Sequence, residues 1–208
     1  MGKLSAAAAV ASFLFLFGCA QGGPAGQAAS AANGSFILPQ SAVSYHARYA
    51  VEEGGPMAKE VWRAGDDMRI DLLVQGKQAL SFYFTGGRAY SCSHLSAPPA
   101  CYDMGARFSQ GDAGRLVPSE KDVAGATKAE SVKIGSTTGE CYDVYAGALG
   151  SRKLCFAPHG VVAYDSYNVS KTMVHTEYLT GIEYYGNGEG IDGGVFALPS
   201  APVFAPSG

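Results

Sequence analysis

Cysteine is the residue whose number and spacing carry the most chemistry in this chain. There are five cysteines, and four of them form two local pairs, Cys92 with Cys101 and Cys141 with Cys155. Exported thiols pair as disulfides, and four cysteines allow three pairings. Proximity in the chain favours Cys92–Cys101 and Cys141–Cys155, since each bond would close a short loop. Neither pair has zinc-ligand spacing, and no Cys-x-x-Cys occurs, so we expect structural disulfides, no metal and no cofactor.

The fifth cysteine, Cys19, ends a short apolar run at the N-terminus. Residues 1–18 carry one basic residue, Lys3, and then about a dozen apolar residues, which suits a secretory signal and is too short to span a membrane. The four residues that end at Cys19, Leu-Phe-Gly-Cys, resemble the lipobox of bacterial lipoproteins. The resemblance implies a signal peptide over 1–18 and acylation, such as palmitate, at Cys19. The alternative is ordinary secretion with a free cysteine near the new terminus.

The segment after Cys19 is typical of a flexible tether. Residues 20–35 are rich in Ala, Gly, Gln and Ser and carry no charge, so they cannot bury enough surface to offset the entropy of ordering. We therefore expect a lipidated cysteine and tether over 19–35 and a single β-rich domain over 36–208. The predicted location is the extracytoplasmic side of a membrane, and the outer membrane if the host has one. Asn33 and Asn168 begin glycosylation sequons, which matter only in a host that glycosylates asparagine.

Composition excludes one large class of partners. The formal net charge is −3, and there is no basic stripe, which argues against a nucleic-acid partner. The chain is rich in Gly and Tyr and poor in charge, which favours exported β-structure.

The body of the chain predicts a series of short strands. From residue 43 to 51 Val, Tyr, Ala, Tyr and Val occupy every second position, which is the period of a half-buried strand. Similar runs bounded by glycine turns predict an antiparallel meander that forms an incomplete, half-open β-barrel. The expected strands cover 42–51, 57–64, 68–74, 79–85, 88–93, 139–147, 152–157, 161–169 and 171–185.

The middle of the chain lacks this rhythm. Residues 96–116 are predicted to be loop, and 105–134 a short, partly helical insertion that lies over the sheet as a lid. Ser119 is a candidate helix cap, and 127–132 is a second helix candidate.

The four histidines are candidates for catalysis. Cys92 with His94, or a serine with His175, would supply a nucleophile and a base, but no nucleophile elbow or cysteine-protease signature surrounds them. We interpret these residues, with His46 and His159, as surface or turn histidines and expect no enzymatic activity.

Some acidic residues are candidates for calcium ligands. Asp66-Asp67, and Asn187 and Glu189 with Asp192, lack the regular spacing of a calcium loop, so turn chemistry is the better interpretation.

Aromatic residues are dense in the predicted strands. Each is expected to fill the core, but a curved sheet so rich in aromatics is also suited to line a concave pocket for an acyl chain. They are Tyr45, Tyr49, Trp62, Phe82, Phe84, Tyr90, Tyr142, Tyr145, Phe156, Tyr164 and Tyr167.

Several segments together resemble a known family. They are Arg69-Ile70-Asp71 after a Gly-Asp-Asp turn, Gly87 to Tyr90, Leu154 to Val161 and Val195 to Pro199. Their rhythm resembles the LolA/LolB/LppX-like envelope lipoprotein carriers and the related outer membrane lipoprotein-sorting proteins. The resemblance implies an incomplete antiparallel barrel with a lipid-binding cavity under helical lids. The soluble carrier of that family has no lipid anchor and needs no paired disulfides, and the resemblance assigns no ligand residue.

These observations favour a tethered, monomeric, non-enzymatic binding domain of the cell envelope. Its expected partners are the membrane, through the anchor, and a lipid or acylated protein ligand. The alternative is a structural or interaction lipoprotein with a packed interior and no small-molecule ligand.

Overall fold

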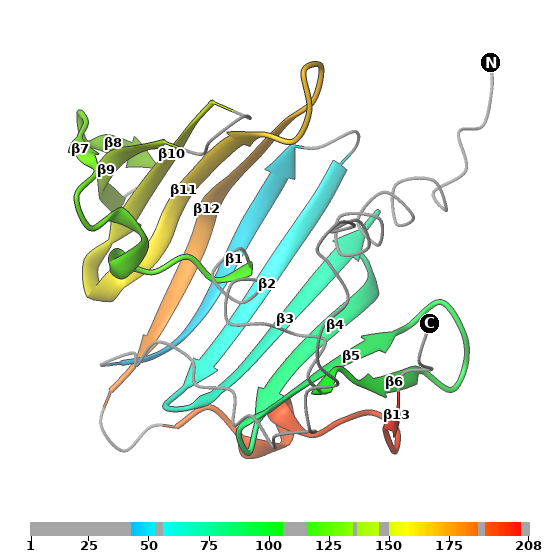
Figure 1. Cartoon of the computed structure of the whole chain (residues 1–208). Helices are drawn as coiled ribbons and strands as arrows, with labels where there is room; N and C mark the ends of the chain where they lie inside the picture. The colour runs from blue at the N-terminus through cyan, green and yellow to red at the C-terminus, as the bar shows by residue number, and fades with distance from the viewer. Residues whose placement is uncertain are drawn as a thin grey trace, which may run out of the picture.

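One 13-stranded β-sheet dominates the computed structural model, which describes residues 43–52, 56–105, 116–134, 137–145, 150–186 and 190–204 (Figure 1). Strands of the first half are β1 (Ser44–Glu52), β2 (Pro56–Ala64), β3 (Asp67–Val74), β4 (Lys77–Thr85), β5 (Arg88–Ser93) and β6 (Ala100–Asp103). Strands of the second half are β7 (Thr127–Lys128), β8 (Val132–Ile134), β9 (Thr137–Tyr145), β10 (Ser151–Ala157), β11 (Val161–Asn168), β12 (Val174–Tyr185) and β13 (Val203–Phe204). Short 3-10 helices lie between them: η2 (Glu120–Val123), η4 (Pro158–Gly160) and η5 (Gly193–Phe196).

Two antiparallel meanders make up the sheet. Strands β1 to β6 pair in chain order, strands β9 to β12 do the same, and β1 pairs with β12 to join the two halves. At one edge β13 lies parallel to β6, and at the other β7 and β8 lie beside β9. Among the described strands these edges do not pair with each other, so the sheet stays open. The predicted mainly β, half-open-barrel fold is confirmed.

Alternating side chains give the sheet two distinct faces. Tyr45, Tyr49 and Val51 of β1 are buried on what we call the inner face, whereas Arg48 between them is exposed on the outer face. The inner face continues into β3 and β4, where Ile70 opposes Phe82 and other large apolar side chains extend the same core. Burial of these side chains is the main driving force for the sheet.

Two connections cross the sheet on opposite faces. The chain between β6 and β7 must travel from one edge to the other, and its described part, residues 116–126, crosses the inner face; we call it the strap. Leu116, Val117 and Val123 of the strap pack against the main core. After β12 the chain returns to the β6 edge over the outer face through residues 190–204, here called the C-terminal segment, where Leu198 packs near Tyr83.

The disulfides join directly opposed residues on neighbouring strands. Cys92 of β5 is bonded to Cys101 of β6, and Cys141 of β9 to Cys155 of β10. This is the pairing predicted from proximity. The first bond holds the strand from which the inner-face connection departs.

Some short elements differ from the sequence prediction. Strand β6 lies within the predicted loop 96–116, and it forms because β5 and the first disulfide hold it in place. The helix predicted over 127–132 is wrong, since β7 and the start of β8 lie there and hydrogen-bond to the edge of β9. The predicted helix start at Ser119 is confirmed: Asp122 accepts hydrogen bonds from the Ser119 backbone N–H at 2.7 Å and hydroxyl at 2.9 Å.

The predicted signal peptide over 1–18, the tether over 19–35, Cys19 and Asn33 lie outside the described residues. In the ranges that the structure describes, no helix is both long enough and apolar enough to cross a bilayer.

Candidate functional site

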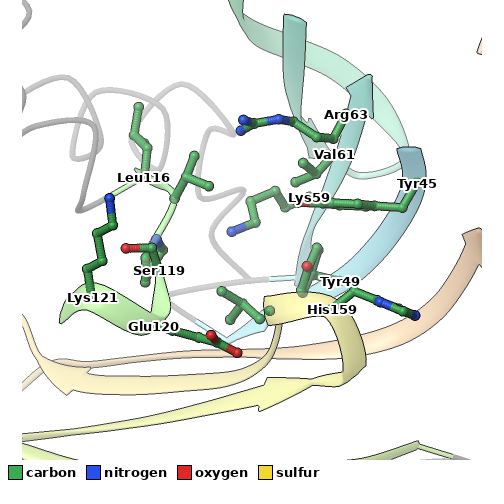
Figure 2. A pocket seen from close by; sticks show the side chains of 14 residues that line it. Tyr45, Tyr49, Lys59, Val61, Arg63, Leu116, Ser119, Glu120, Lys121 and His159 are labelled. Carbon is green, nitrogen blue, oxygen red and sulfur yellow. The ribbon is translucent and has the colours of Figure 1, made fainter. Parts of the chain in front are cut away.

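A pocket of about 460 Å³ lies between the inner face and the strap (Figure 2). Its sheet wall comes from β1 and β2, and its opposite wall is formed by residues 116–121 of the strap. His159 and Gly160, in the turn between β10 and β11, close one side together with Val162. Volumes of roughly 300–1,000 Å³ are typical of small-molecule sites, so this pocket is large enough for one small ligand.

Strand register determines which side chains form the sheet wall. Tyr45 of β1 is directly opposite Arg63 of β2, and Tyr49 is directly opposite Lys59. Between these two pairs lies a smaller pair, in which Val61 opposes an alanine. Since residues two apart on a strand share a face, all of these side chains point to the strap. Figure 2 shows Lys59 and Arg63 extending from β2 toward the strap.

Burial shifts the pKa values of side chains on the sheet wall. Desolvation raises the pKa of Tyr45, although the charge of Arg63 opposes this, and it raises the pKa of Tyr49 strongly. Desolvation also lowers the pKa of Arg63, and neighbouring groups, Tyr45 first among them, work in the opposite direction. The guanidinium of Arg63 stays charged because its pKa starts far above neutral pH. The two tyrosines therefore stay protonated and can donate hydrogen bonds.

Lys59 connects the pocket to a buried ion pair. Its ammonium donates a 2.5 Å hydrogen bond to Glu177 of β12 and lies 4.7 Å from the centre of the Tyr49 ring. Burial of Glu177 favours its neutral form, but Lys59 and the neighbouring His175 outweigh this and hold the pKa of the carboxyl at about 2. The Glu177 carboxyl is therefore ionised at neutral pH.

The buried charges continue along the inner face beyond Glu177. His175 lies 3.6 Å from the Glu177 carboxylate and stacks on Tyr167, with ring centres 4.8 Å apart. The guanidinium of Arg152 lies 5.2 Å from the centre of the Tyr167 ring and makes a two-pronged bond to Asp165, at 2.7 and 2.5 Å. Because Lys59 and Arg152 each pair with a carboxylate, the cluster is compensated internally and does not itself require a ligand.

The strap meets the β10–β11 turn at the side of the pocket. Gly160 has a φ of +73°, and a Cβ at this position would lie 3.6 Å from Oε1 of Glu120. The turn is held from β12, where the Tyr184 hydroxyl donates to the Pro158 carbonyl at 3.1 Å and the Tyr184 ring packs edge-on against His159 at 5.3 Å. The strap therefore packs against a turn that contacts with β12 hold in place.

The candidate pair of Cys92 with His94 does not form a nucleophile and base. Cys92 is in a disulfide and has no thiol to offer. His94 lies 2.9 Å from the Ser81 hydroxyl, but Ser81 is fully buried, and burial lowers the pKa of His94. His46 stacks on Trp62 on the outer face, with ring centres 4.5 Å apart.

The other two histidines lie near the pocket. His159 lines its edge, and His175 belongs to the charge cluster behind Lys59.

The candidate calcium ligands occupy turns. Asp66 lies in the β2–β3 turn, and Asp192 accepts a hydrogen bond from the Gly194 backbone at 3.0 Å, as a helix cap does. Asn187 and Glu189 lie outside the described residues. Over the ranges described, no three His, Cys, Asp or Glu side chains are grouped to hold a metal ion. Asn168 is exposed at the end of β11.

Comparison with known proteins identifies the fold. No protein-family model and no curated protein sequence matches the chain. A crystal structure of MucB is similar at 12% identity and a TM-score of 0.51, covering 76% of this chain and 58% of that one. The structure of the Pseudomonas aeruginosa MucA/MucB complex is similar at 11% identity and a TM-score of 0.51, covering 76% and 56%. The fold is LolA/MucB-like. This chain spans less than two thirds of the MucB chains.

A third structure is similar at a lower score. It is an uncharacterized conserved protein from Thermus thermophilus, with 9% identity and a TM-score of 0.48, covering 71% of this chain and 82% of that one.

The sequence predicted the tyrosines of this pocket but not its cations. The alternation places Tyr45 and Tyr49 in a strand suited to line a concavity, and they do line the pocket. Lys59 and Arg63 were missed, because an alternating charged residue on a strand normally faces solvent. The available indication was that Lys59 and Arg63 each lie two residues from Val61 and so share its face of the strand.

Proposed function

We propose that this protein is a non-enzymatic, membrane-tethered binding protein of the cell envelope that holds an acyl chain or a similar small amphiphile in its pocket. The observation that carries the proposal is the pocket of about 460 Å³ between the inner face and the strap. The lipobox-like segment at Cys19 and the LolA/MucB-like fold also support it.

The pocket walls suit an amphiphile. Val61 and Val162 from the sheet, with Leu116 and Val117 from the strap, offer apolar surface to a hydrocarbon chain. Each CH₂ group removed from water would contribute about 0.8 kcal/mol, so a short chain already gives useful affinity. The ligand would enter beside the strap, which reaches the sheet through side chains and not through strand pairing.

A second candidate function is binding of a protein partner. A structure of MucB, which has a similar fold, is a complex with MucA. In this case the envelope domain would be an interaction module, and any bound lipid would be secondary.

Two experiments test the binding proposal. The first is purification from the native host, followed by organic extraction and mass spectrometry, which should detect a co-purifying amphiphile at a stoichiometry near one. The second compares Val61→Phe, which places a ring in the pocket, with Val174→Phe, which adds the same ring at a position 51% exposed. Only Val61→Phe should lower the amount of bound amphiphile. Equal amounts in both variants, or none in the native protein, would favour the interaction module.

Anchoring is tested separately. Cys19→Ala should move the protein from the membrane fraction to the soluble fraction, because loss of acyl chains removes the anchor. Retention on the membrane would contradict lipidation at this position.

A further inference from the structure

Four hydrogen-bond donors face the pocket from two neighbouring strands. Tyr45 and Arg63 form one directly opposed pair, and Tyr49 and Lys59 form the other. One pocket of about 460 Å³ takes in all four side chains. Figure 2 shows Tyr45, Lys59 and Arg63 extending into the same space.

Two tyrosine side chains lie beside the cations on the pocket wall. Tyr45 is 7% exposed and Tyr49 is 4% exposed, and both line the pocket. A hydroxyl that a ligand removes from water needs a new hydrogen-bond partner, because an unpaired buried polar group is costly. Both hydroxyls point into a space that a ligand can fill, so a ligand oxygen is a natural partner.

Charge on the pocket wall favours an anion. Lys59, Arg63 and Lys121 line the pocket against one carboxylate, Glu120. Behind the wall, Glu177 pairs with Lys59, and Asp66 and Asp67 lie near Arg63, so the excess of positive charge belongs to the side chains that line the pocket itself. Lys59 gives one N–H to Glu177 and, as an ammonium, has two others.

The apolar part of the pocket indicates the chemistry of the ligand beyond its head group. Between the two donor pairs the wall is formed by Val61, and the opposite wall carries Leu116 and Val117. A volume of about 460 Å³ lies at the lower end of small-molecule sites, which suits one hydrocarbon chain better than several.

We infer that the pocket selects a single-chain anionic amphiphile, whose carboxylate or phosphate oxygens accept hydrogen bonds from Tyr45, Tyr49, Lys59 and Arg63. This inference rests on the proposed amphiphile binding and adds the chemistry of the head group.

The test uses four probes on the chain that begins at residue 19 and carries Cys19→Ser. Laurate and dodecyl phosphate are the anionic probes, dodecyl glucoside is the neutral probe, and inorganic phosphate is the head group alone. Isothermal titration calorimetry below the micelle concentrations should give at least about tenfold tighter binding for both anionic probes than for dodecyl glucoside, since hydrogen bonds to charged groups are worth that factor or more.

Variants of the two tyrosines test whether their hydroxyls cause the preference for anionic probes. Tyr45→Phe and Tyr49→Phe remove only the hydroxyl oxygens, and each should weaken laurate and dodecyl phosphate by about tenfold while leaving dodecyl glucoside unchanged. Each single variant is measured as well as the double variant, so that affinities can be obtained even if the double variant is unstable. Tyr102→Phe, on the exposed side of β6, is the matched control and should leave all affinities unchanged.

The outcomes separate this inference from the proposed function. Equal affinity for neutral and anionic probes, or anionic binding that the tyrosine variants leave intact, would overturn the anion assignment while amphiphile binding stands. Inorganic phosphate binding as tightly as dodecyl phosphate would overturn the amphiphile part. Failure of every probe to bind would overturn both.

Discussion

Lys59 of β2 and Glu177 of β12 are joined by a 2.5 Å hydrogen bond across the intervening strand β1. The side chains are 10% and 5% exposed, and they are 118 residues apart in the chain. This ion pair links the two meanders of the sheet on the inner face. It also forms the boundary between the pocket and the charge cluster behind it.

Removal of one partner should be much more damaging than removal of both. Lys59→Met leaves Glu177 charged and buried, and should lower the free energy of unfolding by about 3–5 kcal/mol. Lys59→Met combined with Glu177→Leu should recover most of this loss, because no buried charge is then unpaired. Urea denaturation of the two single variants and the double variant measures the coupling. Additive losses would contradict the proposed dependence of one charge on the other.

Stability should fall in acid through Glu177. Its carboxyl has a pKa of about 2 in the folded protein against an ordinary value of 4.5, so between these values the unfolded chain binds more protons. The stabilisation is therefore complete above pH 4.5 and is lost as the pH falls toward 2, by about 3 kcal/mol in total. Urea titrations at stepped pH should show a shallower decline for Glu177→Gln. Parallel curves for the two proteins would refute this assignment.

Arg69 should hold the C-terminal segment on the outer face. Its guanidinium donates to the Val195 carbonyl at 3.1 Å and to both oxygens of Asp71, at 2.9 and 2.6 Å. Arg69→Lys loses this forked geometry, and should cost about 1–3 kcal/mol. Hydrogen exchange should accelerate in the C-terminal segment and stay unchanged in β9 to β12.

Arg48→Lys supplies the control for that experiment. Arg48 pairs with Glu183 at 2.8 Å, but both side chains are about half exposed, so the change should have almost no effect on exchange. Equal acceleration in both variants would show that Arg69 has no special role.

The disulfides should contribute stability in proportion to the loops that they close. Cys141→Ala with Cys155→Ala opens a loop with a sequence separation of 14 and should cost about 3 kcal/mol in the chain-entropy model. Cys92→Ala with Cys101→Ala opens a shorter loop, with a separation of 9, and should cost slightly less. Thermal unfolding of both double variants measures the difference, and unchanged melting temperatures would refute it.

Local pattern was sufficient for much of this fold. The alternation of side chains between the two faces of β1, the glycine turns and the spacing of the four paired cysteines each act over a few residues. The main strands and both disulfides were therefore predictable from the chain alone. Short elements were harder to predict from the sequence. Two-residue strands such as β7 and β13 have no periodicity, and they exist only because a neighbouring strand offers free hydrogen-bonding groups.

The pocket depends on contacts that no local pattern encodes. Tyr45, Lys59 and Arg63 are neighbours of the strap only because the connection from β6 must cross the inner face to reach the other edge of the sheet. Lys59 is tolerated inside only because β1 brings Glu177 within reach. The sequence determines the strands through short-range periodicity, while burial of charge and the shape of the pocket follow from long-range pairing, which depends on the complete topology.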